Sequence, residues 1–461
     1  MGSRTVVVTS LAALLALAVY TAPLGTAPSV SADLAAGPVG RSWVLSSMSL
    51  GLAVFMISAG SVADELGRRR VFLAGLAVLL ASVVVAGLAP DVLVFVLARI
   101  VQGVASAAIV AAGLALLAHA VPAGPHRTHA TGLWGAGFGA GVALGPVFGA
   151  VAQQLSTWRW AYALLAVLTL ALLLAARDRL TESTADQPRP VDLAGMATLS
   201  IALSALVAGL TEGRQGWARP AVLVLLIIAV AGFGAFLVSQ RRSAHPLLDL
   251  GLWRRPGFLG VVLGAFATGA GITAAMSLLP TALQQGQRVS VVDTALILLA
   301  WSVPSALTSA AVRRLPAAWS GTARLTGTLL VVAAGLAATA VLAPDAPWWA
   351  VLPGTVVAGV ATGPLNATLG RESVAVVPAG RAGIGGGVNN AARFLGASIG
   401  VTVVSGVTGT GSAAHLLHGW NISALVCAAL SVLGAALILL AHRTSMPRSG
   451  LQTAKSLSRN G

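Results

Sequence analysis

Charged side chains are scarce in this chain. Asp, Glu, Lys and Arg make up 9% of its 461 residues, whereas 57% of the residues are hydrophobic. A typical soluble domain carries about 25% charged residues. So few charges cannot cover the water-facing surface of a soluble protein of this length. The composition therefore argues against a soluble fold and indicates an outer surface that faces lipid.

Cysteine and lysine are almost absent as well. Cys427 is the single cysteine and lies in an apolar run, so the sequence allows no internal disulfide and no cysteine metal site. Lys455 is the single lysine, and the net charge of +15 comes from arginines in small clusters between apolar runs, a distribution that argues against a nucleic-acid partner. We recognise no nucleophile–base pair, metal cluster or phosphate-binding loop, and therefore expect no enzyme activity, no cofactor and no metal.

Long polar stretches are scarce too. The longest, about Arg177 to Asp192, is a linker. The rest of the chain forms fourteen apolar segments, and since membrane strands would be about half as long and would alternate, we predict an all-α protein with fourteen membrane-spanning helices. A signal peptide is the alternative for the first segment, but that run is long enough to span and many others follow. The approximate segments are Val6–Val30, Trp43–Val62, Val71–Ala89, Val92–Ala118, Gly132–Gln153, Trp160–Ala176, Leu193–Leu210, Ala221–Val238, Phe258–Leu279, Val291–Val312, Leu325–Leu342, Trp349–Leu369, Ile384–Val404 and Ile422–Ala441.

The connections alternate in positive charge. With the amino terminus in the cytosol, 21 basic residues lie on the cytosolic side and 5 on the other. Positive residues favour the cytosolic side of a membrane protein. The sequence therefore predicts a multi-pass protein of the plasma membrane with both termini in the cytosol.

A glycine- and arginine-rich motif joins the second and third segments. Its glycines allow a tight turn and close backbone approach, and its aspartate can pair with the arginines or with a neighbouring helix N-terminus. An ordinary charged loop that sets the topology is the alternative interpretation. The motif reads Gly60-Ser-Val-Ala-Asp64-Glu65-Leu-Gly67-Arg68-Arg69-Arg70.

Two further motifs place polar residues inside predicted helices. Arg99-Ile-Val-Gln102-Gly103 lies in the fourth segment, where a charge costs about 2.5 kcal/mol or more on insertion scales. Arg99 and Gln102 share a helix face; Arg99 could serve transport or be held structurally by backbone carbonyls. In the thirteenth segment Asn389, Asn390 and Arg393 can share one side of the helix, and Arg393 could bind substrate or only join helices.

The fifth segment carries a glycine face. Gly137, Gly141, Gly145 and Gly149 recur every four residues with Pro146 beside them. Small residues at this spacing let membrane helices pack closely. Dinucleotide binding is excluded as an explanation, because no strand precedes the glycines and the run is apolar.

Together these motifs resemble the signatures of the major facilitator superfamily, and the fourteen segments resemble its fourteen-helix drug:proton antiporter family. The resemblance implies a cytoplasmic gating loop, a set of coupling and substrate residues, and the antiporter helix found in exporters of the superfamily. The gating loop would comprise Gly60, Asp64, Gly67, Arg68 and Arg69; the coupling and substrate residues Arg99, Gln102, Gly103, Asn389, Asn390 and Arg393; and the antiporter helix Gly132, Gly141, Gly145, Pro146 and Gly149.

The resemblance also implies the major facilitator fold, two six-helix bundles plus two inserted helices. We expect the N-terminal bundle in residues 1–185, the inserted helices seven and eight in residues 186–245, the C-terminal bundle in residues 246–445 and a cytosolic tail in residues 446–461.

Three positions depart from the family pattern. Glu65 stands where a basic residue is usual, Ala150 replaces a glycine, and Val19 occupies a position that is often acidic in the first helix. None of the 13 acidic residues lies deep in a predicted span, so the proton carrier is not evident.

The sequence as a whole predicts a proton-coupled exporter of small amphipathic compounds such as antibiotics, drugs or secondary metabolites. Its expected partners are a small-molecule substrate, protons and membrane lipid, and the chain is expected to be a monomer. Because the only charges at membrane depth are Arg99 and Arg393, we expect neutral or anionic substrates rather than organic dications. The alternatives are an importer or facilitator of a small metabolite and a non-transporting membrane sensor.

Overall fold

The computed structural model describes residues 2–185, 190–214, 216–312, 319–378, 381–408 and 412–443, and all regular secondary structure in these residues is helical. The predicted tail and linker residues 186–189 lie outside the described residues. The helices are α1 Gly2–Thr21, α2 Pro23–Asp33, α3 Pro38–Leu66, α4 Arg68–Gly87, α5 Val92–Ala120, α6 Pro125–Leu155, α7 Arg159–Arg177, α8 Leu193–Gly213, α9 Pro220–Arg242, η1 Leu250–Arg254, α10 Pro256–Thr268, η2 Gly269–Thr273, α11 Ala274–Thr281, η3 Ala282–Gly286, α12 Val291–Ala310, α13 Gly321–Ala338, η5 Trp348–Val351, α14 Leu352–Ala375, α15 Ala382–Thr408 and α16 Ala413–Arg443.

The predicted membrane segments correspond to these helices. Among the described residues, 13 helices are long and apolar enough to cross a membrane, the first of them Gly2–Ala27, which includes α1 and part of α2. The remaining predicted segment is α15, whose 27 residues extend about 40 Å, enough for a hydrocarbon core of about 30 Å. The prediction of an all-α protein that crosses the membrane many times is therefore confirmed.

Several helix boundaries differ from the sequence prediction, and the start of α13 is one example. Helix α13 begins at Gly321, four residues before the predicted start at Leu325. The side chain of Ser320 accepts a hydrogen bond from the backbone N–H of Ala323 and so caps the helix. Arg324 is thereby drawn into the first turn of α13, where it is mostly buried.

Apolar side chains cover much of the outside of the bundle. Helix α9 is the most exposed of the candidate spans, and its Ile227 and Val230 are 67% and 74% exposed. A helix that is apolar on every face and yet exposed cannot be stable in water. This surface fits contact with lipid acyl chains.

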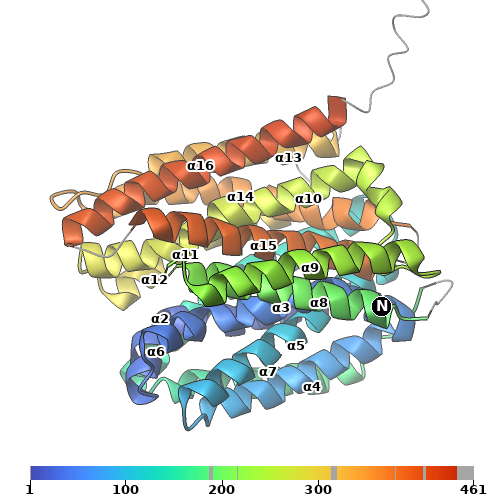
Figure 1. Cartoon of the computed structure of the whole chain (residues 1–461), viewed down its shortest axis with the longest axis horizontal. Helices are drawn as coiled ribbons and strands as arrows, with labels where there is room; N and C mark the ends of the chain where they lie inside the picture. Colours follow the sequence, from blue (N-terminus) through green and yellow to red (C-terminus); the bar gives the residue numbers. More distant parts are fainter. Residues whose placement is uncertain are drawn as a thin grey trace, which may run out of the picture.

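The buried apolar residues form two main cores. One is built by α1–α9 and the other by α10–α16, and Figure 1 shows the blue and cyan helices on one side and the yellow and red ones on the other. Phe258 at the start of α10 and the first half of α15 are exceptions, because Phe258, Ile384, Val388 and Phe394 belong to the first core. Helix α15 therefore crosses from one half of the molecule to the other, while the α8–α9 pair packs on α3 and α15.

Close backbone approach joins the two halves at two helix pairs, α3 with α15 and α6 with α12. A side chain at Gly60 would clash with the backbone carbonyl of Gly383, and one at Gly132 would clash with that of Ser309. Both contacts are possible only because no Cβ is present.

Two of the membrane crossings contain interruptions of the regular α-helix. The first crossing changes from α1 to α2 at Ala22, just before Pro23, and the crossing that begins with α10 contains π-helical turns at Gly269–Thr273 and Ala282–Gly286. Such π-turns occur often at functional sites.

The two ends of the bundle differ. Helix α1 begins and α16 ends at the same end, which is the right-hand end in Figure 1. We call this end the terminus side and the other end the far side. Since the crossings alternate, α3 ends and α15 begins on the terminus side, and α8 ends on the far side.

We predict that the terminus side is cytosolic, because most of the arginine clusters lie on it. Alkaline phosphatase fused after residues 90, 215, 285 or 345 should be active, and green fluorescent protein at the same positions should be dark. Fusions after residues 122 and 179 should give the reverse pattern. Two or more far-side positions that read as cytosolic would contradict this topology.

Candidate functional site

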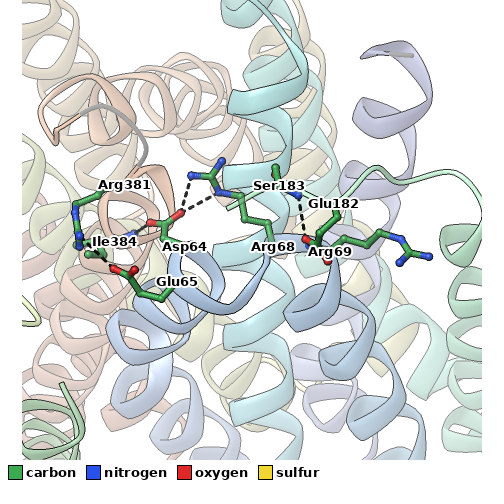
Figure 2. A network of polar contacts seen from close by, with 8 residues as sticks. All are labelled: Asp64, Glu65, Arg68, Arg69, Glu182, Ser183, Arg381 and Ile384. Atoms are coloured by element: carbon green, nitrogen blue, oxygen red, sulfur yellow. Dashed lines mark hydrogen bonds and ion pairs between the residues drawn. The ribbon is translucent and has the colours of Figure 1, made fainter. Parts of the chain in front are cut away.

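Asp64 lies in the last turn of α3 and is fully buried. Its Oδ1 accepts hydrogen bonds from Arg68, four residues later at the start of α4, with 3.0 Å to Nε and 2.9 Å to Nη2 (Figure 2). The turn between the two helices is Gly67, whose φ of 119° is a conformation that residues with a Cβ rarely adopt. The sequence Asp64–Gly67–Arg68 therefore folds the carboxylate and the guanidinium onto each other.

The other oxygen of Asp64 faces the second half of the molecule. Oδ2 accepts a hydrogen bond of 3.2 Å from the backbone N–H of Ile384 in the first turn of α15. The exposed N–H groups of a helix N-terminus carry partial positive charge and favour an anion. The glycine contact between Gly60 and Gly383 brings the two backbones close enough for this bond. One carboxylate thus joins α3, α4 and α15.

Glu65 forms a second contact across the same boundary. Its Oε1 lies 3.1 Å from Nη2 of Arg381, directly before α15 (Figure 2), and both side chains are mostly buried. Glu65 is the acidic residue that departs from the family pattern. The structure gives its physical reason, because a basic side chain at this position would face Arg381 across the interface.

Glu182 is a member of this cluster that the sequence analysis missed. Its carboxylate accepts hydrogen bonds from the backbone N–H groups of Arg69 at 2.9 Å and Arg70 at 3.1 Å, so it caps the N-terminus of α4 from the linker after α7. Two backbone bonds hold the same segment in place, from Ala185 N to the Asp64 carbonyl and from Arg68 N to the Ser183 carbonyl. The sequence carries no signal for this contact, since Glu182 belongs to no motif.

We refer to Asp64, Glu65, Arg68, Glu182, Arg381 and Ile384 as the Asp64 network. It closes the terminus side of the boundary between the two halves. Arg69, the remaining predicted loop residue, donates from Nη2 to the Arg177 carbonyl at 2.6 Å and so ties α4 to the end of α7.

Arg99 is fully buried in α5 and does not line the cavity that is described below. Its Nη1 donates to the Val19 carbonyl at 2.6 Å and to Gln102 Oε1 at 3.0 Å, and its Nη2 donates to the Tyr20 carbonyl at 2.9 Å. Gln102 in turn donates to the Ser82 carbonyl at 3.1 Å. Arg99 and Gln102 therefore connect α1, α4 and α5.

Pro23 explains why α1 needs Arg99. In a continuous helix the Val19 carbonyl would accept from the N–H of residue 23, and proline has no N–H. Arg99 supplies the missing donor. Although Val19 lacks the acidic side chain that is frequent at this position in the family, its backbone oxygen accepts a hydrogen bond from the arginine.

The glycine face of α6 packs on α1. A side chain at Gly141 would clash with the Leu14 carbonyl, and one at Gly149 would come within 2.6 Å of the Ala22 carbonyl. Gly145 meets Thr21 and the Ala18 carbonyl in the same way, and Pro146 lies inside α6. Gly103 likewise packs against α3 at Gly51. These glycines act within the first half of the molecule, whereas Gly132 meets α12 of the other half.

A cavity of about 200 Å³ lies between the two halves. Residues of α1–α3, α6 and α8 form one wall, and residues of α10–α12, α14 and α15 form the other. Many lining residues, such as Thr211 and Thr281, lie towards the far side, and the Asp64 network closes the boundary on the terminus side. The cavity is mostly apolar with a few polar groups, which is typical of a small-molecule site.

The predicted substrate residues divide between cavity and core. Arg393 lines the cavity, whereas Asn389 and Asn390 are buried beside it in α15 and do not. Asn366 and Trp301, which belong to no motif, also line the cavity. Only the packing of helices from both halves brings these residues together, so the sequence alone could not identify them.

Comparisons with known proteins agree with this arrangement. A family model described as Major Facilitator Superfamily matches residues 9–401. The chain is 30% identical over 382 residues to the multidrug resistance protein Stp of Mycobacterium tuberculosis (strain CDC 1551 / Oshkosh), covering 82% of this chain and 71% of that protein. It is 32% identical over 409 residues to the puromycin resistance protein pur8 of Streptomyces alboniger, covering 87% and 80%.

Solved structures are similar over nearly the whole chain. The human organic anion transporter MFSD10 (TETRAN) aligns with a TM-score of 0.66 and 18% identity, covering 95% of this chain and 99% of that one. The proton:xylose symporter XylE aligns with a TM-score of 0.67 and 16% identity, covering 95% of each. At these identities the similarity establishes the fold alone.

We predict that the Glu65–Arg381 pair can be reversed. Glu65→Arg or Arg381→Glu alone should lower the melting temperature of the purified protein clearly, since removing one partner of a buried pair costs about 3 kcal/mol. The double variant restores opposite charges and should recover at least half of the loss. A double variant that is as unstable as the sum of the two single variants would contradict the pairing.

We also predict that Arg99 and Pro23 are energetically coupled. Arg99→Ala should destabilise the protein less in a Pro23→Ala background than in the wild type, because an alanine N–H can bond the Val19 carbonyl. The difference in unfolding free energy should be about 1 kcal/mol or more for residues that share a partner. Unfolding titrations in mixed detergent measure all four proteins, and simple additivity would refute the coupling.

Proposed function

The chain belongs to the Major Facilitator Superfamily, and from this premise we propose that it exports small amphipathic compounds, such as antibiotics or other drugs, by proton antiport. The family identifies the chain as a multi-pass membrane transporter and not an enzyme. The observation that carries the proposal is a cavity between the two halves that the Asp64 network closes on one side. Export rather than import is supported by the resistance proteins among its relatives and by the glycine face of α6.

We place the terminus side in the cytosol and the protein in the plasma membrane. In this orientation the structure corresponds to an outward-facing state with a closed cytoplasmic gate. The loop residues predicted from the first motif then stabilise the gate, and Glu65, Glu182 and Arg381 belong to it as well. The domain division at residues 185 and 245 fits this scheme, with α8 of the inserted pair contributing to the cavity wall.

Transport would proceed by alternating access, in which one half rocks against the other about a central site. Opening the cytoplasmic side requires the bonds of Asp64 to Ile384 and of Glu65 to Arg381 to break. The glycine contacts between α3 and α15 separate at the same time. Contacts within each half, such as α6 on α1, stay in place.

The coupling proton is best assigned to the gate. None of the described residues that line the cavity is acidic, whereas Asp64 and Glu65 are buried outside the cavity, on the terminus side of the boundary between the halves. Protonation of Asp64 would weaken its attraction to Arg68 and to the N-terminus of α15. A proton that reaches Asp64 would therefore favour opening towards the cytosol, where the next substrate binds.

We predict that inverted membrane vesicles with an acidic interior accumulate an aromatic amphipathic compound, and that collapsing the pH gradient abolishes the accumulation. Asp64→Asn should slow turnover about tenfold or more, because the neutral amide cannot hold the positively charged partners. Its substrate affinity should stay within a few-fold, since Asp64 does not line the cavity.

Asp178→Asn serves as the control, because Asp178 is an exposed carboxylate on the same side of the bundle. It should transport like the wild type. Uptake by right-side-out vesicles in place of inverted ones would indicate an importer, and full transport by Asp64→Asn would remove this residue from the gate.

A further inference from the structure

Arg99 and Arg393 are buried well inside membrane-spanning helices, beyond the first turn, and their surroundings differ. Arg99 donates hydrogen bonds to two backbone carbonyls and one side-chain amide. Arg393 is 6% exposed, and its side chain makes no hydrogen bond or ion pair with the described residues. Buried charges are normally paired. The guanidinium of Arg393 lacks the hydrogen-bond acceptors that the guanidinium of Arg99 has.

Within the part of the chain that the structure describes, the Arg393 guanidinium packs on an aromatic ring. Its Cζ lies 5.2 Å from the centroid of Phe138 in α6 of the opposite half. A cation–π contact occupies one face of the guanidinium and leaves the in-plane N–H groups free to donate. In the same wall, the buried Oδ1 of Asn366 has no hydrogen-bond partner among the described residues.

The described residues that line the cavity carry positive charge and no negative charge. Among the described residues that line it, the charged side chains are Arg393 in the wall and Arg214 at the far-side end of α8. A negatively charged group that enters would find donors already oriented, and its attraction to Arg393 is strengthened by the low dielectric of the site.

The same cavity offers surfaces for a flat apolar body. Tyr20, Phe138, Trp301 and Phe394 line it from four different helices. Tyr20 and Phe394 pack edge to face with their centroids 5.8 Å apart. The aromatic walls around the Arg393 guanidinium match a ligand that combines an aromatic body with one negative charge.

We propose that Arg393 is the anion-binding residue of the substrate site and that the preferred substrate is an aromatic monoanion, a carboxylate or an ionised phenol. The direction in which this substrate moves rests on the proposed export function. Its binding to Arg393 does not.

The test uses three compounds that share one three-ring body and differ in charge at pH 7: anthraquinone-2-carboxylate, anthraquinone-2-carboxamide and 2-(aminomethyl)anthraquinone. Equilibrium dialysis with the purified full-length protein measures binding, and proteoliposomes with a pH gradient measure flux. The affinity of the wild type for the carboxylate should be at least about tenfold higher than its affinity for the amine.

Three variants separate recognition from structure. Arg393→Gln should weaken carboxylate binding about tenfold and carboxamide binding much less. Arg393→Lys keeps the charge without the planar donor fork, so it should show a smaller loss. Arg254→Gln removes the same charge from an exposed site outside the cavity and should bind like the wild type.

The outcomes distinguish this proposal from the export function. Equal weakening of carboxylate and carboxamide in both Arg393 variants would make Arg393 a helix-joining residue and overturn the assignment. Flux of the amine or the carboxamide without the carboxylate would also overturn it, while leaving an exporter. Carboxylate binding that depends on Arg393 without any flux would support the site and contradict export.

Discussion

The closed state of this protein depends on a buried carboxylate. Asp64 has no contact with water in this state, and its partners belong to two other helices, Arg68 of α4 and the N-terminal backbone of α15. A buried ion that loses a partner is strongly disfavoured. Helix α15 can therefore leave α3 only when water reaches Asp64 or a proton neutralises it. The contact between α3 and α15 is therefore stable while Asp64 is dry and ionised, and it weakens when water or a proton reaches this residue.

Glycine decides which helices stay together and which can part. In lipid, helices gain little from burying apolar surface, so close backbone packing supplies much of the attraction. The contacts of Gly141 and Gly149 hold α6 on α1 within one half, where Pro23 and Arg99 also join neighbouring helices. The contacts of Gly60 and Gly132 lie between the halves. The first set favours a rigid unit, and the second allows two units to meet without side chains that interlock.

The two buried arginines show how one residue type takes different roles. Proline at position 23 leaves a backbone carbonyl without its helical donor, and Arg99 fills that position. Arg393 has no such carbonyl and instead lies on Phe138 at the cavity wall. The protein itself supplies the hydrogen-bond acceptors for the buried guanidinium of Arg99. For Arg393, a bound ligand would supply them.

The sequence by itself determined the class of fold. Fourteen apolar segments separated by short connections can form only membrane helices, because lipid offers no hydrogen-bond partner to an unpaired backbone, and the spacing of glycines and arginines was enough to indicate the family. It also located Asp64, Arg99 and Arg393 as unusual residues, because a charge beside or within an apolar run is costly wherever it folds. Only the tertiary structure decided which group each charged side chain contacts. Glu65 with Arg381, Glu182 with the start of α4, and Arg393 with Phe138 are separated by more than a hundred residues in the chain. Such pairings are set by how whole helices pack, and local sequence patterns carry no information about them.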